Sequence, residues 1–169
     1  RAFQIPYTDE SQRYTRLDGI TSCATRTPRH YQREAVDTWH KSGRRGSVIL
    51  PTGSGKTFVA ELVIAETARA TLVVAPTLDL VGQWHDRLKT AFGRPIGMLG
   101  GGHHEIEDIT VSTYDSAAIH MGRYGDRFGL LVFDEVHHLG APGYLSAAAA
   151  AIAPYRLGLT ATWETDAER

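Results

Sequence analysis

A glycine-rich segment, residues 51–57, carries the strongest chemical signal in the sequence. It reads Pro-Thr-Gly-Ser-Gly-Lys-Thr and lies between a predicted strand and a predicted helix. Glycines let successive backbone N–H groups point at one place, and a helix start adds partial positive charge, so the segment is typical of a phosphate-binding loop. Lys56 would reach the β- and γ-phosphates, and Thr57 would offer its hydroxyl to Mg²⁺. The strict pattern has glycine where this chain has Leu50, and an ordinary glycine-rich turn is the alternative.

Two adjacent carboxylates, Asp134 and Glu135, form the second signal. They follow the apolar run 130–133, so a predicted strand delivers them at its carboxyl end. Asp134 suits coordination of the Mg²⁺ held by Thr57, and Glu135 is placed to orient and deprotonate an attacking water. Taken alone, such a pair often marks only the start of a loop. Together with a phosphate loop it favours hydrolysis of a nucleotide over transfer to a bound acceptor.

The spacing of apolar residues predicts the elements that position these groups. An i, i+4, i+5, i+8 pattern from Tyr31 predicts a helix at residues 29–42 whose outward face includes Gln32. Further helices are predicted at residues 56–70 and 78–92, and strands at residues 47–50, 71–75, 109–112, 130–133 and 156–159. The alanine-rich stretch 147–151 is expected to be a helix packed against the sheet. Strands that are apolar throughout and alternate with helices are typical of a parallel α/β sheet, which binds ligands at the carboxyl ends of its strands.

These motifs together resemble the DExH-box helicases and translocases of superfamily 2, and they follow the order found in those proteins. The segments that carry the resemblance are residues 29–36, 51–57, 75–84, 110–114, 134–137 and 159–162. Within the superfamily, residues 100–102, 113–116 and 133–139 look most like XPB-type DNA helicases, which usually lack the first glycine of the phosphate loop. The resemblance implies a three-layer α/β, RecA-like P-loop NTPase domain with a mainly parallel central sheet.

For the nucleotide, the resemblance implies a binding set around the phosphate loop. Gln32 would hydrogen-bond the edge of adenine, and Arg29 could stack on its face. The expected nucleotide-binding residues are Arg29, Gln32, Thr52, Gly53, Ser54, Gly55, Lys56 and Thr57. The expected catalytic residues are Glu135, Lys56, Asp134 and His137, with Thr57 and Asp134 as metal ligands and ATP and Mg²⁺ as cofactors.

For the nucleic acid, the resemblance implies contacts from Thr77 and Thr113 to the phosphodiester backbone. Each threonine could equally be a helix N-cap or a strand-end residue. His137, Thr160 and Thr162 would link the γ-phosphate to a second RecA-like domain, which we expect to lie outside these residues together with its arginine finger. The chain departs from XPB-type proteins after Thr162, where those proteins usually carry an Arg-Glu-Asp triplet and this sequence continues Trp-Glu-Thr-Asp.

Length and composition narrow the class of protein. The chain has 169 residues, of which 42% are hydrophobic and 22% charged, and this predicts one globular domain with an ordinary core. We expect residues 1–24 to be the remnant of a preceding domain or linker, and residues 25–169 to be the first RecA-like helicase domain. The net charge of −1 provides no global basic field, so any contact with nucleic acid must be local.

Cysteine and histidine usage points to an intracellular protein without a zinc site. Cys23 is the one cysteine and belongs to no paired ligand spacing. His103 and His104 stand near two glutamates, but their spacing matches no zinc pattern, and a solvated loop is the favoured interpretation. No apolar run is long enough to span a bilayer, so we expect no membrane partner and a cytoplasmic (prokaryotic) or nuclear location.

The combined interpretation is the ATP-binding domain of a nucleic-acid-dependent ATPase, closest to an XPB-type DNA helicase or translocase, with DNA favoured over RNA as partner. A restriction-type or remodelling duplex translocase and an RNA-directed DExH enzyme share every motif present. A small-molecule P-loop kinase is a different class, and the cluster at residues 134–137 disfavours it. The isolated chain is expected to be a nucleotide-binding module with little turnover.

Overall fold

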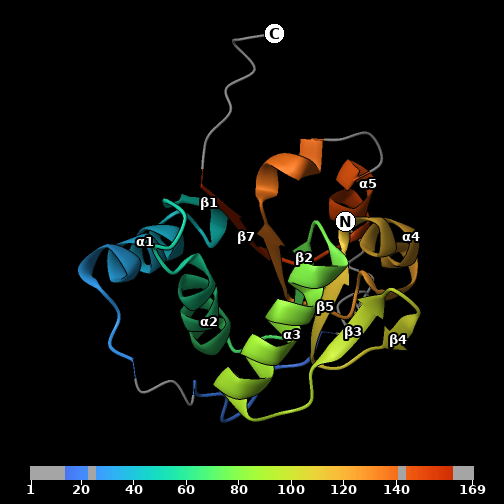
Figure 1. The fold of residues 1–169 in the computed structure, drawn as a ribbon, viewed down its shortest axis with the longest axis horizontal. Coiled ribbons are helices and arrows are strands. Elements are labelled where there is room, and N and C mark those ends of the chain that lie inside the picture. Colours follow the sequence, from blue (N-terminus) through green and yellow to red (C-terminus); the bar gives the residue numbers. More distant parts are fainter. Residues whose placement is uncertain (1–13, 23–25, 141–143, 162–169) are drawn as a thin grey trace, which may run out of the picture.

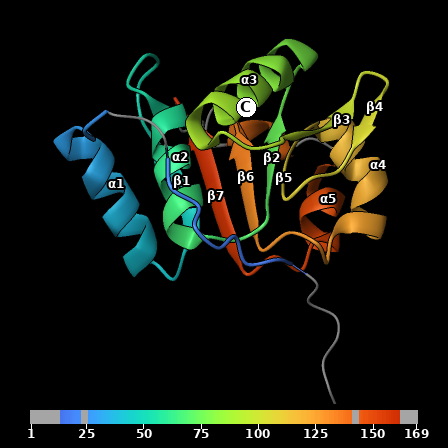
Figure 2. The same ribbon diagram turned by 90° about the horizontal axis from the view of Figure 1, so that it is seen from below.

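The computed structural model describes residues 14–22, 26–140 and 144–161, and these form three layers around a central sheet (Figures 1 and 2). The described helices are α1 (His30–Lys41), α2 (Lys56–Thr67), α3 (Leu78–Phe92), α4 (Tyr114–Tyr124) and α5 (Tyr144–Ala150), with a 3₁₀ helix, η1, at Val136–Gly140. The described strands are β1 (Arg45–Ile49), β2 (Thr71–Ala75), β3 (Gly97–Gly100), β4 (His103–Glu105), β5 (Ile109–Thr113), β6 (Leu130–Asp134) and β7 (Tyr155–Thr160).

The described strands form one sheet in the order β1-β7-β6-β2-β5-β3-β4. All neighbouring pairs are parallel except the hairpin of β3 and β4. Strands β2, β5 and β6 are buried along their whole length, because helices cover both faces of the sheet. The expected α/β fold with a mainly parallel sheet is therefore confirmed, and the ends of β1 and β6 bring the two chemical motifs to the same edge.

Successive residues of a strand face opposite layers of the domain. Val73 of β2 packs into a core shared with α1, α2 and α3. Its neighbours Leu72 and Val74 pack into a second core with α4 and α5, which contains Ala148 and Ala151 of the alanine-rich stretch. Figure 2 shows the two helical layers on either side of the strands. The sheet is thus fixed from both faces, and the loops at its carboxyl edge stand on a rigid base.

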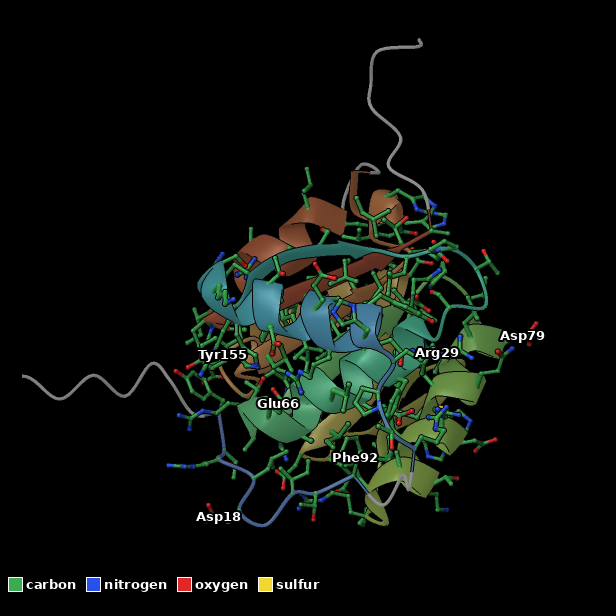
Figure 3. All side chains as sticks on the ribbon, turned by 90° about the vertical axis from the view of Figure 1, so that its left-hand side faces the viewer. Asp18, Arg29, Glu66, Asp79, Phe92 and Tyr155 are labelled. Carbon is green, nitrogen blue, oxygen red and sulfur yellow. The ribbon has the colours of Figure 1, made fainter. Side chains whose placement is uncertain are left out.

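A charged cluster fastens α1 to α2. The carboxylate of Glu66 accepts a hydrogen bond from Nη2 of Arg33 at 3.1 Å and forms another with Nε2 of His40 at 2.9 Å. Figure 3 shows Glu66 at the boundary between these helices. Burial raises the pKa of Glu66, but the hydrogen bonds from Arg33 and His40 outweigh it, and the pKa lies below its usual value. The cluster ties α1 to the last turn of α2, at the end of that helix away from the loop that precedes it.

Helix α2 ends at Thr67, although the apolar pattern predicts that it continues to Ala70. Ala68 adopts a left-handed conformation with φ +50° and ends the helix. The turn is stabilised from outside, because the backbone N–H of Leu17 donates to the carbonyl of Ala68 at 2.9 Å. Leu17 is itself buried in the larger core, so this part of the first 24 residues packs against the domain.

The sequence patterns did not predict β3, β4, α4 or η1. The hairpin of β3 and β4 turns at three glycines, residues 100–102, whose φ angles are +128°, +61° and +89°. Because glycine carries no side chain, such a segment shows no apolar pattern. Helix α4 follows β5 without a loop, so the apolar pattern of its start cannot be separated from that of the strand. Within the described ranges, no helix is both long and apolar enough to cross a membrane.

Candidate functional site

The segment between β1 and α2 is shaped by two glycines in left-handed conformations. Gly53 has φ +78° and Gly55 has φ +86°, which other residues rarely adopt. A Cβ atom at Gly55 would lie 2.5 Å from Nε2 of Gln32, so the loop is tightly packed on the side of α1. A Cβ atom at Gly53 would meet nothing within 4 Å. The loop therefore leaves open space beside the first turn of α2, where helix N–H groups attract anions.

Two polar side chains of the loop, those of Lys56 and Ser54, differ in their hydrogen bonding. Lys56 donates from Nζ to the carbonyl of Leu50 at 3.2 Å, so its ammonium group folds toward its own loop. The Oγ atom of Ser54 is buried and has no hydrogen-bond partner, which sets it apart among the described buried side chains. Since buried polar groups are nearly always paired, an orphaned hydroxyl in a glycine-rich loop fits a site that a phosphate oxygen would complete.

Asp134 is buried at the end of β6, with a relative exposure of 9%. Its Oδ2 atom accepts a hydrogen bond from Nε1 of Trp84 at 2.8 Å, and its Oδ1 atom accepts one from the backbone N–H of Glu135 at 3.1 Å. Burial raises the pKa of Asp134, the hydrogen bond from Trp84 opposes this, and the charge of Glu135 adds to it. The two donors are uncharged, so the negative charge of this carboxylate lacks a directly bound cation among the described residues.

One cavity joins the phosphate-loop segment to the carboxylate pair. It has a volume of about 310 Å³, and Gly55, Thr57 and Asp134 all line it. The charge of Lys56 also acts to lower the pKa of Asp134, which shows that both segments lie in one electrostatic environment. The geometry thus brings together the two motifs that the sequence separates, as a shared triphosphate and metal ion require.

Much of the remaining wall of this cavity comes from residues that the sequence patterns did not assign to a site. Arg26, Phe58, Gln83 and Arg87 line it, and the guanidinium carbon of Arg26 lies 4.4 Å from the centre of the Phe58 ring. Glu61 forms ion pairs with both arginines and is fully buried. These residues belong to the segment before α1, to α2 and to α3. Because no local spacing connects the three segments, only their packing reveals the cavity wall.

The helical pattern predicts that Gln32 lies on an outward face of α1. In the structure its side chain is buried, with 5% exposure. Its Nε2 atom donates to the carbonyl of Ser54 at 2.8 Å, and its Oε1 atom accepts from the N–H of Arg29 at 3.0 Å. The expectation was wrong because the phosphate loop, rather than the sheet, covers this side of the helix. Arg29 donates to the hydroxyl of Tyr31 at 3.2 Å, and Tyr31 donates to the same Ser54 carbonyl at 2.7 Å.

Glu135 follows Asp134 in a left-handed conformation with φ +49°, which is unfavourable for a residue with a side chain. Its Oε2 atom lies 3.6 Å from Nδ1 of His137, and the same nitrogen lies 3.3 Å from Oγ1 of Thr160. The structure thus brings together the ends of β6 and β7 at this histidine. Thr162 lies outside the described residues. The catalytic and coupling roles of these residues stay predictions.

Thr77 and Thr113 are both helix N-caps, one of the two possibilities left open by the sequence. Oγ1 of Thr77 accepts from the N–H of Leu80 at 3.3 Å at the start of α3. Oγ1 of Thr113 accepts from the N–H of Ser116 at 3.1 Å at the start of α4 and donates to the Ser116 hydroxyl at 3.0 Å. The nucleic-acid contacts expected of them stay predictions, since capping does not exclude a backbone contact by the same helix end.

His103 and His104 lie on the exposed strand β4 rather than in a loop. Nε2 of His104 forms a hydrogen bond of 2.8 Å with the hydroxyl of Tyr124, and its ring lies 5.0 Å from that of His120. In the part of the chain that the structure describes, no group of three or more histidine, cysteine, aspartate or glutamate residues could hold a metal ion. His104 therefore forms a surface contact between the hairpin and α4.

Comparisons with known sequences place this geometry in a family. Residues 25–165 match the family described as "Type III restriction enzyme, res subunit". The chain is 49% identical over 138 residues to the DNA 3'-5' translocase XPB2 of Sulfurisphaera tokodaii, covering 82% of this chain and 31% of that protein. It is 35% identical over 145 residues to the DNA 3'-5' helicase XPB of Mycobacterium tuberculosis, covering 79% and 26%. The chain thus spans less than a third of these relatives.

Solved structures show the same fold. The SWI2/SNF2 ATPase core of Sulfolobus solfataricus, solved in complex with dsDNA, matches with a TM-score of 0.68 at 19% identity, covering 88% of this chain and 34% of that one. The UvsW helicase of bacteriophage T4 matches with a TM-score of 0.67 at 21% identity, covering 85% and 55%. At these identities the likeness shows the fold alone. The match over residues 25–165 shows the family, and the solved structures show the RecA-like fold of superfamily 2 helicases. The chain therefore belongs to the family of the type III restriction enzyme res subunit.

Proposed function

We propose that this chain is the ATP-binding domain of a DNA helicase or translocase of the XPB type, which couples ATP hydrolysis to movement on DNA. The observation that carries the proposal is the shared cavity, lined by Gly55 and Thr57 of the phosphate loop and by Asp134. The relatives named DNA 3'-5' translocase or helicase supply the proposed substrate and the 3'-5' polarity. Since this chain spans less than a third of them, the activity is proposed for the intact protein.

The residues present fit a nucleoside triphosphate and magnesium. The open space at Gly53 and the unpaired hydroxyl of Ser54 would receive phosphate oxygens. Lys56 would exchange its bond to the Leu50 carbonyl for one to the β- and γ-phosphates, which costs little because that bond is to a neutral acceptor. Thr57 and Asp134 would hold Mg²⁺ with oxygen ligands, which this ion prefers.

Hydrolysis would depend on the carboxylate next to the metal ligand. When bound, magnesium neutralises charge on the phosphates. Glu135 would orient a water molecule in line with the γ-phosphate and accept its proton. His137 lies between Glu135 and Thr160, so it would report the state of this carboxylate to β7 and to a second RecA-like domain. That domain is proposed as the partner that supplies an arginine finger.

The base of the nucleotide would lie beside Gln32. The side-chain amide of Gln32 uses one N–H and one lone pair inside the domain, so one donor and one acceptor remain for the edge of adenine. Arg29 is hydrogen-bonded to Tyr31, whereas Arg26 lines the cavity and lies over Phe58. Arg26 is also ion-paired with Glu61 at 3.4 Å, so Arg29 stays the proposed stacking residue, and Arg26 is an alternative that would keep its ion pair.

DNA would contact the carboxyl edge of the sheet at the starts of α3 and α4. Thr77 and Thr113 cap these helices, and helix N-termini with neutral donors bind phosphates without reading sequence. The net charge of −1 means that such contacts are few and local. We expect weak, salt-sensitive binding by this domain and tighter binding when a second domain closes over the strand.

The test measures ATP binding and DNA-stimulated turnover in the intact protein. Lys56→Ala is expected to lower turnover at least about 100-fold, because it removes a charge that acts on the phosphates. Glu135→Gln is expected to keep ATP binding and lose turnover about 1000-fold, because it removes the base but preserves the shape. Lys89→Ala, at an exposed position of α3, is the matched control and should leave both properties unchanged.

Each of the following outcomes would contradict the proposal. Normal turnover by Glu135→Gln would show that another group activates the water. A wild-type protein that binds ATP but transfers its phosphate to a small acceptor, or does not respond to DNA, would place the chain in a different class of P-loop enzyme. Stimulation by RNA alone would redirect the proposal to an RNA-dependent enzyme of the same superfamily.

A further inference from the structure

Tyr114 makes a buried contact between two strands that are not neighbours. It is the first residue of α4, directly after β5, and is 2% exposed. Its hydroxyl donates a hydrogen bond of 2.9 Å to the backbone carbonyl of Asp134, at the end of β6. Strand β2 lies between β5 and β6 in the sheet. The tyrosine therefore bridges the end of the central strand and connects α4 directly to the catalytic carboxylate pair.

The hydroxyl group is not needed for packing. The ring of Tyr114 stacks on that of Phe133, with centroids 6.3 Å apart, and contacts the ring of Tyr144 at 5.2 Å. A phenylalanine would keep both contacts. A buried hydroxyl costs free energy unless it is hydrogen-bonded, so its presence here is compensated by the bond to Asp134. The distinctive contribution of the tyrosine is thus its hold on one carbonyl oxygen.

That carbonyl belongs to the peptide between Asp134 and Glu135. Glu135 has φ +49°, a conformation that persists only where neighbouring contacts enforce it. Two contacts act on this peptide: the N–H of Glu135 donates to Oδ1 of Asp134, and the carbonyl of Asp134 accepts from Tyr114. Together they set the direction in which the Glu135 carboxylate leaves the backbone. A shift of the tyrosine would rotate the peptide and re-aim the carboxylate.

The first turn of α4 is also the place where DNA is proposed to bind. Thr113 caps the helix, and a Cβ atom at Gly100 would lie 2.9 Å from Oγ of Ser116, so the glycine hairpin lies close to the same turn. Figure 1 shows the β3–β4 hairpin beside α4. Tyr114 directly follows Thr113, so a ligand that moves Thr113 would also move Tyr114. The side chain of Tyr114 alone connects the start of α4 to the peptide between Asp134 and Glu135.

We infer that Tyr114 is a positioning residue that couples DNA contact at the start of α4 to the orientation of Glu135, and so to the rate of ATP hydrolysis. The inference rests on the proposed function and adds the route by which DNA stimulates turnover. It names a single hydrogen bond, from the Tyr114 hydroxyl to the Asp134 carbonyl, as that route.

The test compares Tyr114→Phe with Tyr124→Phe in the intact protein. Both variants remove one tyrosine hydroxyl from α4; the hydroxyl of Tyr124 contacts only His104 among the described hydrogen bonds, at the far end of the helix. For Tyr114→Phe, the ratio of turnover with DNA to turnover without DNA should fall about fivefold, with the KM for ATP within about twofold of wild type. Tyr124→Phe should keep the wild-type ratio.

Three results overturn the inference. The first is a wild-type ratio in Tyr114→Phe, and the second is an equal loss of the ratio in Tyr124→Phe. The third is loss of ATP binding by Tyr114→Phe, which would make the hydroxyl merely structural. Failure of the proposed function is recognised separately, because it appears in the wild-type protein as absent ATP binding or absent response to DNA. Unchanged DNA affinity of Tyr114→Phe, measured by anisotropy with a labelled duplex, supports a role in coupling rather than in binding.

Discussion

Glu61 and Asp134 are two buried carboxylates near the same cavity, and they differ in what surrounds them. Glu61 is fully buried on α2, with Nη2 of Arg26 at 3.4 Å and the guanidinium of Arg87 also bound to it. Asp134 is 9% exposed and receives hydrogen bonds from the Trp84 indole and a backbone N–H. Burial raises the pKa of both groups; the charge of Arg26 opposes this at Glu61, and a neutral indole does so at Asp134.

The difference separates a carboxylate that holds the fold together from one that is left for a ligand. The charge of Glu61 is compensated inside the domain by two cations, so its place is structural. The charge of Asp134 is oriented by neutral donors and faces the cavity, where a cation bound to the phosphate loop would compensate it. Burying the Asp134 carboxylate without a counter-charge lowers the stability of the domain, and binding of a cation would offset this loss.

The largest expected effect is that of Asp134→Asn on turnover. Removing this proposed metal ligand should lower DNA-stimulated ATP hydrolysis of the intact protein about 1000-fold. The effect of the same substitution on the stability of the domain should depend on pH. Because the pKa of Asp134 is raised by folding, the wild-type domain loses stability as pH rises from about 4, the value in unfolded chains, through the folded pKa. Asparagine does not titrate.

The stability of Asp134→Asn relative to wild type should therefore increase from pH 4 to pH 7, as measured by urea unfolding of the 169-residue chain at both values. A relative stability that decreases over this range would show that Asp134 is paired with a cation within the fold. The two buried carboxylates would then be alike, and the comparison would lose its basis.

The second effect is on stability, at Glu61. Glu61→Gln preserves the shape of the side chain but leaves Arg26 and Arg87 facing each other without a counter-charge. The free energy of unfolding should fall by about 2 kcal/mol, less than for a fully buried pair because both arginines are partly exposed. Glu66→Gln is the matched control on the same helix, and its more exposed pairs should cost about 0.5 kcal/mol. Equal losses in urea unfolding would contradict the structural role of Glu61.

The smallest effect sharpens the role of the neutral donor at Asp134. Trp84→Phe removes the hydrogen bond to Oδ2 and leaves the carboxylate less well oriented. The Mg²⁺ concentration for half-maximal turnover of the intact protein should rise about fivefold. Trp39→Phe is the control, because Trp39 is equally buried and its indole donates to the Arg156 carbonyl at 2.9 Å, away from the cavity. A rise in both variants would indicate a general loss of packing.

Some elements could be predicted to the residue. Strand β2 and helix α3 match residues 71–75 and 78–92. The apolar run 72–75 ends at Pro76, and a threonine cap and a final glycine bound the helix. Helix α4 was missed because it continues β5 without a loop, and the hairpin of residues 100–102 because glycines leave no pattern. Gln32 was placed on the wrong side, since a helical pattern shows which residues share a face but not what covers that face.

The sequence alone determined that the chain carries a phosphate loop and a carboxylate pair at strand ends, because each motif is contiguous and its chemistry follows from residue types at fixed spacing. Only the tertiary structure decided that Asp134 is held by Trp84 and Tyr114, and that Glu61 is neutralised by Arg26 and Arg87. The physical reason is that burial and pairing set the energy of a charge. Both depend on side chains that are distant in sequence and meet only when the sheet and its helices pack.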